Sequence, residues 1–335
     1  MDNPTLTDYV PLMYTLFDLF MQWRIQVGSP KPGKPFTYTE KAMIVFFTMM
    51  QLRRIFRFKA QRRWLQAHRK MASLLGWVTI PHRTTLSRRY KALYATICRF
   101  VLFIAQYAPD LDARFSPQHL IEDKSLFKAL GPVWHQSDRK AGRIPDKLRN
   151  LDTDATWSKS GYHGWVYGYG LHMTCNEDAF PAVVQVETGA VSESAVIEQK
   201  ADPIIGQLAP DTVAADNSYT KAMRIRHWAK KGIALLTPAH KWVKGRYATA
   251  YHRFIQEPDM AERLRKRRTS VEPLFDLVAK VLGTTARQKQ LPVQGIKNVR
   301  TCLALAILTV QIAMIVNSIW GLPLRNVSVM TAALT

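Results

Sequence analysis

The pattern of apolar and polar positions divides the chain into a helical first part and an α/β second part. Residues 4–27 are expected to form a short helix, and the Pro- and Gly-rich segment 28–35 a turn or linker. In the segment 51–70, apolar and basic side chains interleave at helical spacing. A helix that ends near Gly76 and another that begins after Pro81 predict a helix–turn–helix.

The second helix of this pair has an apolar stripe and a polar beginning. Thr84 or Thr85 is expected to cap its N-terminus. The stripe follows helical spacing at Leu86, Tyr90, Leu93, Ile97 and Phe100. The first turns, where a recognition helix would meet DNA, hold Arg83, Ser87, Arg88 and Lys91. A simple helical hairpin with a basic rim is the alternative interpretation.

After Asp110 the pattern changes to strands that alternate with helices. Strands are expected at 119–123, 165–175, 180–188, 212–219 and 233–239, the second and third forming a hairpin. Helices are expected at 192–208, 219–232 and 247–283. This order predicts an α/β fold in which a mixed sheet is flanked by helices. The polar segment 124–164 is too long for an inert connection and is predicted to be a functional loop.

The most apolar window, residues 301–323, allows two interpretations. Its length suits a membrane span, but Gln311 and Asn317 interrupt it. We therefore predict a buried core helix, and no association with a membrane.

The charge of the chain is strongly positive and unevenly placed. The net charge is +22, and the segment 41–109 holds fourteen Lys or Arg residues and no Asp or Glu. Solvated helices usually mix charges of both signs, so the absence of acids favours a DNA-binding surface over an ordinary solvated one. The candidate contacts in this segment, besides those on the second helix, are Arg53, Arg54, Arg57, Arg62 and Arg63.

Three of the scarce acids suggest a metal site. Asp123 and Asp216 are expected at the ends of strands, and Glu272 on a following helix. Such residues could converge at one edge of the sheet, where ligands of open α/β sheets bind. Three carboxylates suit Mg²⁺ or Mn²⁺, and two such ions can catalyse phosphodiester displacement. Each acid taken singly is better explained as an ordinary strand-end or helix-surface carboxylate, whereas the three together, with this strand order, favour the metal site. Asp276, one turn after Glu272, competes as third ligand.

Three motifs carry a resemblance to a known family: LIEDKSLF with Asp123, VAADNSYT with Asp216, and RRTSVEPLFDLVAKVLG with Glu272. From about Gln118 to Arg325 the chain resembles a DDE transposase of a bacterial insertion sequence, of the group whose prototype is insertion sequence four. The third motif of that group runs Tyr-x2-Arg-x3-Glu-x6-Lys. Arg268 keeps the spacing to the glutamate, whereas Arg265 replaces the tyrosine and Lys280 lies one residue late.

The resemblance implies an RNase H-like catalytic domain over 116–335, after a helical DNA-binding region over 1–115. It further implies metal-dependent cleavage and strand transfer at the ends of the element, with Asp123, Asp216 and Glu272 as metal ligands. Arg268 and Lys280 would bind phosphate, and the protein would act as a homo-oligomer assembled on transposon ends and target DNA. A non-mobile or domesticated RNase H-like nuclease and a DNA-binding protein without catalysis are the alternatives.

The cysteines and the N-terminus bear on location. Three widely spaced residues, Cys98, Cys175 and Cys302, do not form a disulfide framework or a zinc motif, which fits a reducing compartment. The first residues show no basic segment followed by an apolar one, so no signal peptide is expected. We therefore expect a cytoplasmic protein, associated with the bacterial nucleoid.

Overall fold

The computed structural model describes residues 6–26, 36–161, 164–238 and 246–334, and the expected linker 28–35 lies outside them. The chain forms two compact units, one of Met1–Ile104 with Leu277–Thr335 and the other of Ala105–Asp276. This division differs from the expected one at residue 115, because the C-terminal helices belong to the same unit as the N-terminal ones.

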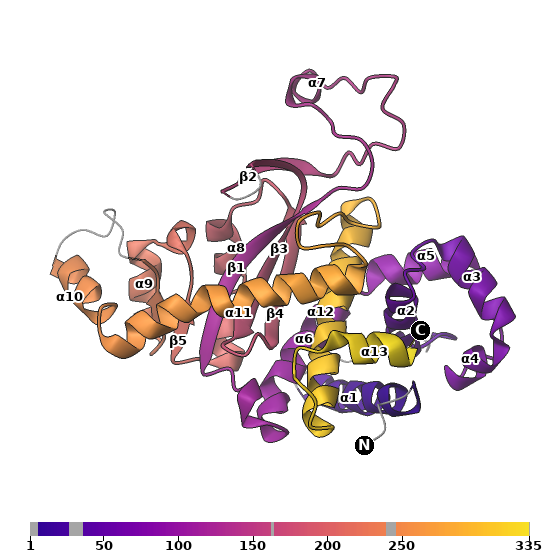
Figure 1. Cartoon of the computed structure of the whole chain (residues 1–335), viewed down its shortest axis with the longest axis horizontal. Coiled ribbons are helices and arrows are strands. Elements are labelled where there is room, and N and C mark those ends of the chain that lie inside the picture. Colours follow the sequence, from indigo (N-terminus) through magenta and orange to yellow (C-terminus); the bar gives the residue numbers. More distant parts are fainter. Residues whose placement is uncertain (1–5, 27–35, 162–163, 239–245, 335) are drawn as a thin grey trace. The chain divides into compact units, whose positions relative to one another are not determined.

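The first unit is helical (Figure 1). Its elements are α1 (Leu6–Gln26), α2 (Glu40–Leu52), α3 (Phe58–Ala67), α4 (Arg69–Leu74), α5 (Arg83–Ala92), most of α6 (Tyr94–Tyr107), the end of α11 (Pro258–Leu282), α12 (Ile296–Ile319) and α13 (Val327–Leu334). The segment 51–70 is therefore not one helix. A turn follows α2, and Arg54 adopts a left-handed conformation there with φ +57°.

The expected helix–turn–helix corresponds to α4 and α5. Gly76, with φ +71°, allows the turn after α4. His82 caps α5, in place of Thr84 or Thr85, because its ring nitrogen accepts a hydrogen bond from the backbone of Thr84. The second helix ends at Ala92, and α6 continues the chain. The predicted apolar stripe is nevertheless buried along both helices.

Helix α12 forms the centre of the first unit and packs against α2 and α5. Its polar residues are buried with partners: Gln311 donates to the carbonyl of Val101, and Asn317 to the carbonyls of Pro323, Leu324 and Asn326. By length and composition α12 is the one helix of the described chain that could span a membrane, or one of two spans if α5 and α6 are counted as a bent pair. Most of its apolar window is buried, as predicted for a core helix.

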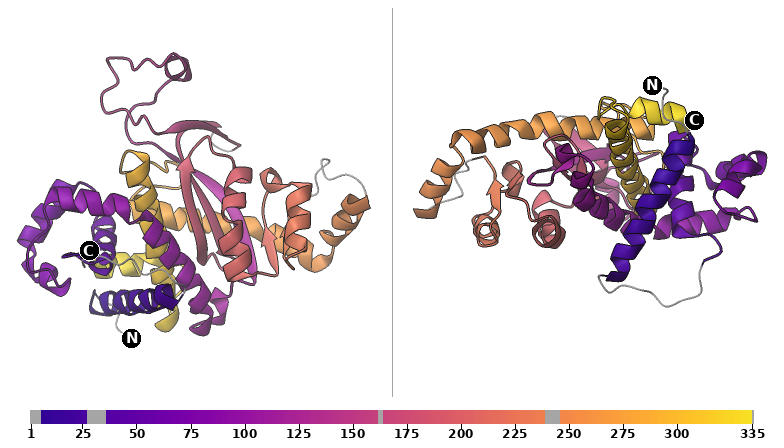
Figure 2. Two further views of the ribbon diagram at one scale, coloured as in Figure 1. Left: turned by 180° about the vertical axis from the view of Figure 1, so that it is seen from behind. Right: turned by 90° about the horizontal axis from the view of Figure 1, so that it is seen from below.

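The second unit contains a six-stranded sheet (Figures 1 and 2). Its strands are β1 (His119–Lys128), β2 (Thr156–Ser160), β3 (Gly164–Asn176), β4 (Pro181–Thr188), β5 (Thr212–Ala214) and β6 (Ala234–Leu236). The long strand β3 is antiparallel to β1, and on its other side it pairs with β4 and β2. Strands β5 and β6 run parallel to β1. This mixed sheet, flanked by helices, has the predicted RNase H-like arrangement.

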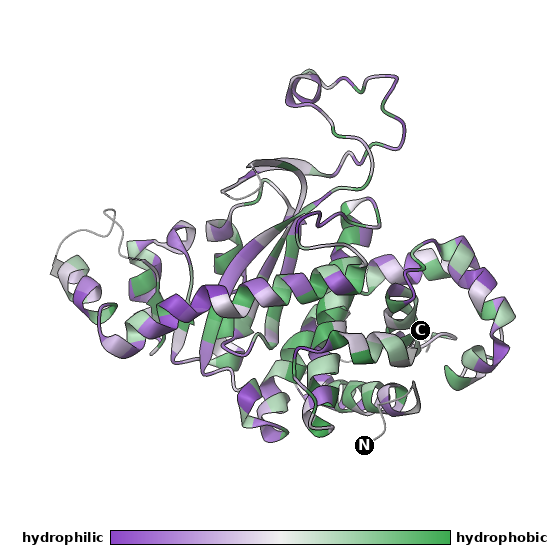
Figure 3. Cartoon of the chain, in the orientation of Figure 1, coloured by the Kyte–Doolittle hydropathy of each residue, from purple (hydrophilic) through white to green (hydrophobic). Residues whose placement is uncertain are grey.

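The helices of this unit are α7 (Gln136–Lys140), α8 (Glu193–Gln199), a π-helix (Pro203–Leu208), α9 (Ala222–Ala229), α10 (Arg246–Phe254) and the larger part of α11. Helix α11 lies across one face of the sheet, in front of it in Figure 1 and behind it in the left view of Figure 2. Its first half is rich in hydrophilic residues (Figure 3). The expected helix 247–283 is therefore two helices.

The first strand is longer than expected. Residues 124–128 pair with Gly168–His172 of β3, so β1 continues five residues beyond Asp123. Asp123 consequently lies in the middle of the strand and not at its end. The expected loop 124–164 shrinks to residues 129–155, which include the short helix α7, before β2 begins.

Candidate functional site

Asp123 points from the middle of β1 toward α11. One carboxylate oxygen accepts a hydrogen bond from the backbone of Lys124 at 2.8 Å, and the other from the Arg267 guanidinium at 3.0 Å. The side chain is 20% exposed. Ser270, on the same helix, donates to the carbonyl of Glu177 and holds α11 against the β3–β4 turn.

Asp216 lies beside Asp123 because of the register between two parallel strands. Ile121 of β1 pairs with Ala214 of β5, so the chain two residues further on reaches Asp123 on one side and Asp216 on the other. Asp216 also caps the short turn Asn217–Tyr219, and Ser218 donates to its Oδ1 through both its backbone nitrogen, at 2.8 Å, and its hydroxyl. The two aspartates therefore share the carboxyl edge of β5.

Burial, together with the negative charges of Asp216 and Glu122, raises the pKa of Asp123 to about 7. The positive charge of Arg267 and the hydrogen bond from Lys124 oppose this rise. Because Asp123 is largely buried beside a second carboxylate, its ionised form is unfavourable, and a bound cation would stabilise that form.

We expect the raised pKa of Asp123 to appear in the pH dependence of stability in the metal-free protein. An unfolded aspartate titrates near 3.9, so the folded protein holds its proton more tightly, and this stabilisation is lost as pH rises through about 7. Between pH 5 and 8 the loss is about 2–3 kcal/mol. Urea unfolding in chelator should show that Asp123→Asn loses less stability than wild type over this range, by that amount. Parallel curves would contradict the assignment.

The third predicted acid is not part of this pair. Glu272 is exposed on α11, and so is its rival Asp276. Among the described residues, no group of three or more His, Cys, Asp or Glu side chains could hold a metal ion. The structure thus brings together two of the three predicted acids, and Glu272 lies about 140° around the helix axis from the arginine that reaches Asp123.

The arginine beside Asp123 is also not the predicted one. Arg268 is exposed, whereas its neighbour Arg267 makes the ion pair. Lys280 is exposed and belongs to the other unit. Helical spacing could have found Arg267, because Val271 and Leu274, four and seven residues later, are both fully buried and define the inward face.

The opposite face of β1 carries a buried polar cluster that the sequence did not reveal. Glu122 is fully buried and receives hydrogen bonds from Lys200, at 2.5 Å, and from Thr174. Burial raises the pKa of Glu122, opposed chiefly by the charge of Lys200. Lys124 lies on this face and donates to the carbonyls of Gly189 and Val191.

His172 is a member of the same face and does not approach Asp123. It pairs with Lys124 across β1 and β3 and is fully buried. Burial, with the charges of Lys200 and Lys124, lowers the pKa of His172 to about 2. The imidazole is therefore neutral and structural.

The donor set of the aspartate pair fits a divalent cation. Two neighbouring carboxylates, one of them largely buried, supply hard oxygen ligands of the kind that Mg²⁺ and Mn²⁺ prefer. Such a cation would also offset the burial and the charge repulsion that raise the pKa of Asp123. The third ligand is not assembled with them in this structure.

Most of the predicted DNA contacts surround α5. Arg62 and Arg63 line a hollow of about 360 Å³ with Lys59, His82 and Arg83. A second hollow beside α5, of about 730 Å³, includes Ser87, Arg88 and Lys91.

The remaining predicted contacts differ in their environment. Arg53 stacks on the Trp64 ring, 4.8 Å from its centroid, and burial lowers its pKa. Arg54 packs against Gly283, where an added Cβ would lie 2.8 Å from the guanidinium. Arg57 is exposed. Arg53 and Arg54 therefore have a packing role that the charge pattern did not predict.

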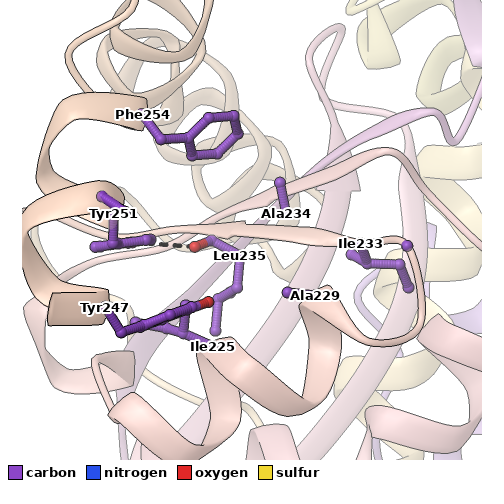
Figure 4. A pocket seen from close by; sticks show the side chains of 10 residues that line it. Ile225, Ala229, Ile233, Ala234, Leu235, Tyr247, Tyr251 and Phe254 are labelled. Atoms are coloured by element: carbon purple, nitrogen blue, oxygen red, sulfur yellow. Dashed lines mark hydrogen bonds between the residues drawn. The ribbon is translucent and has the colours of Figure 1, made fainter.

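A further hollow, of about 340 Å³, lies among α9, β6 and α10 (Figure 4). Its lining is apolar, apart from Tyr247 and Tyr251. The Tyr251 hydroxyl donates to the carbonyl of Leu235 and so covers the edge strand. None of the predicted acids lines this hollow, and its lining offers no carboxylate that could bind a metal ion.

Comparison with known proteins gives the family. A comparison with curated proteins found no significant match. Two solved structures share 12% and 11% identity with the chain: the Mos1 strand transfer complex, with 79% of this chain and 84% of that one covered, and the Mos1 transposase paired-end complex with left transposon end, with 80% and 86% covered. Both TM-scores are 0.21, too low to carry an argument. The family described as transposase DDE domain matches residues 114–292, more than half of the chain, and the chain therefore belongs to that family.

Proposed function

We propose that this protein is a DNA transposase that cleaves DNA at the ends of its own insertion sequence and joins those ends to target DNA. The observation that carries the proposal is the pair of neighbouring carboxylates within a transposase DDE domain, Asp123 in the middle of β1 and Asp216 just after the parallel strand β5. The acid-free basic surface around α5 supplies a partner site for DNA.

In this proposal Asp123 and Asp216 hold a divalent cation, with Glu272 as third ligand from the motif. Bound divalent ions activate the attacking oxygen and stabilise the leaving oxygen in phosphodiester displacement. The residues around them have separate tasks. Ser218 orients Asp216 through two hydrogen bonds to one carboxylate oxygen. Arg267 presents a planar guanidinium beside Asp123, suited to a phosphate oxygen.

The attacking group is water in the cleavage step and a DNA 3′-hydroxyl in the joining step. Both attacks displace an oxygen from phosphorus in line with the incoming one. Pairing of two transposon ends requires two active sites, so we propose that the protein acts as a homo-oligomer on DNA.

The test uses the purified chain, a duplex with the terminal repeats of the element, and a supercoiled target plasmid. We expect strand cleavage at the repeat ends and joined products with Mg²⁺ or Mn²⁺, and neither in chelator. Cleavage without joining would establish the nuclease alternative in its place. Binding without cleavage in either metal would establish a DNA-binding protein without catalysis.

We expect Arg57, which is exposed, and Arg62 and Arg63, which line the hollow beside α3, to affect DNA binding more than Arg53, which packs on Trp64. Removing three charges with Arg57→Gln, Arg62→Gln and Arg63→Gln should reduce the slope of log affinity against log salt by about three, because each lost phosphate contact removes about one. Arg53→Gln is the matched control: it packs on Trp64, so the slope should change little. Fluorescence anisotropy across a salt series measures both. An unchanged slope in the triple variant would refute this DNA surface.

A further inference from the structure

Two basic hollows adjoin α5, one shared with α3 and one shared with α12. The hollow toward α3 is lined by Lys59, Arg62 and Arg63 of α3, with Arg83 at the start of α5. The hollow toward α12 is lined by Arg88 and Lys91 of α5 and by two residues outside the basic segment, which are Lys297 and Arg300 of α12. Neither lining contains an acidic residue. Two clusters of positive charge therefore adjoin α5.

The first turn of α12 is held against the end of α5 and the start of α6 by specific contacts. Lys297 and Arg300 are three residues apart and lie on one helix face. The Arg300 guanidinium lies over the Tyr94 ring, 5.6 Å from its centroid. Thr301 donates to the carbonyl of Tyr90 at 2.9 Å. These contacts join α12 to the junction of α5 and α6, so the first turn of α12, which carries both cations, is held beside α5.

A helix with two such clusters beside it matches the geometry of duplex DNA. The major groove is about 12 Å wide, close to the diameter of a helix with its side chains, and a phosphodiester backbone runs along each of its margins. A helix in the groove therefore has one phosphate strand on each side, and α5 has one basic hollow toward α3 and another toward α12. Basic side chains that only solvate a surface would not be expected to gather in two separate hollows beside one helix.

We propose that α5 enters the major groove, and that the two hollows bind the two phosphodiester backbones on either side of it. The α3 hollow holds one strand. The first turn of α12, through Lys297 and Arg300, holds the other, so the DNA interface extends well beyond the basic segment 41–109. This inference rests on the proposed function only for the identity of the partner as duplex DNA.

Two charge-removing pairs test the proposal on a duplex that carries one terminal repeat. One variant combines Lys297→Gln with Arg300→Gln, and the other combines Lys59→Gln with Arg63→Gln. We expect each pair to reduce the salt slope of binding by about two. Phosphate-ethylation interference should then fade on one strand for the first variant and on the opposite strand for the second.

A third variant, Lys230→Gln with Lys231→Gln, removes two exposed charges from the end of α9 as a matched control and should leave the interference pattern intact. Because Arg300 packs on Tyr94, the exposed Lys297→Gln alone gives a second measurement, with an expected slope change of about one. An unchanged slope in both α12 variants would overturn the proposal, as would loss of the same phosphates in both pairs.

The outcome is separable from that of the proposed function. A wild-type protein that binds DNA with the expected interference on both strands but never cleaves it would refute the transposase and leave this inference standing. A protein that cleaves and joins while the α12 variants bind with an unchanged slope would refute only the role of α12.

Discussion

Asp123→Ala and Asp216→Ala should each abolish DNA cleavage and joining, with a loss of at least about a thousandfold in rate. The two carboxylates lie side by side, and the proposed metal chemistry needs both, so removing either leaves too few ligands. DNA binding should keep its salt slope, because the basic hollows lie on other elements. A cleavage assay on terminal-repeat DNA and a binding isotherm on the same substrate separate the two effects. Cleavage by either variant near the wild-type rate would remove that aspartate from the site.

The third acid is decided by a comparison within α11. Glu272 and Asp276 are both exposed and one helical turn apart, so alanine at either position should leave the fold intact. We expect Glu272→Ala to abolish cleavage, and Asp276→Ala to retain it. The reverse result would make Asp276 the third ligand.

Lys200→Met should destabilise the protein by about 3–5 kcal/mol, because it leaves Glu122 fully buried without its ion-pair partner. The folded protein would then favour the protonated form of Glu122. Its folded pKa would rise further above the unfolded value, so the loss should shrink as pH falls and grow as pH rises. Urea unfolding at several pH values measures the effect.

The double variant Glu122→Gln with Lys200→Met is the control for the buried pair. It removes both charges together, and we expect it to recover most of the stability lost by Lys200→Met alone. A single variant that loses less than about 1 kcal/mol would show that the pair is not isolated from solvent.

The sheet was predictable because its order follows from local patterns. Two β-rich runs separated by a short turn identified the β3–β4 hairpin, and the strand–helix alternation identified β5, α9 and β6. The end of β1 was missed because Lys124 and Ser125 resemble the start of a polar loop. Lys124 is instead buried, with its ammonium held by the carbonyls of Gly189 and Val191, which follow it by more than sixty residues. No local pattern contains such a contact.

The aspartate pair of the site was predictable from the sequence, but the residues around it were not. Parallel pairing of β1 with β5 brings Asp123 and Asp216 together, and strand order implied this. The inward arginine depends on the rotation of α11 about its axis, which one position in the motif does not define. The motif therefore indicates Arg268, whereas Arg267 contacts Asp123. The Glu122–Lys200 pair joins residues 78 positions apart, and charge alone favours the surface for both.

The helical unit is assembled from both ends of the chain, and this affects its synthesis. Residues 1–104 need α12 in their centre, but the ribosome makes the whole α/β unit before α12 emerges. At roughly 5–20 residues per second, the apolar face of α2 waits on the order of 10–50 s for its partner. A chain released before residue 277 would contain α5 without its core and without Lys297 and Arg300. Such a truncated chain should bind DNA more weakly than the complete protein, because two of the proposed phosphate contacts are missing.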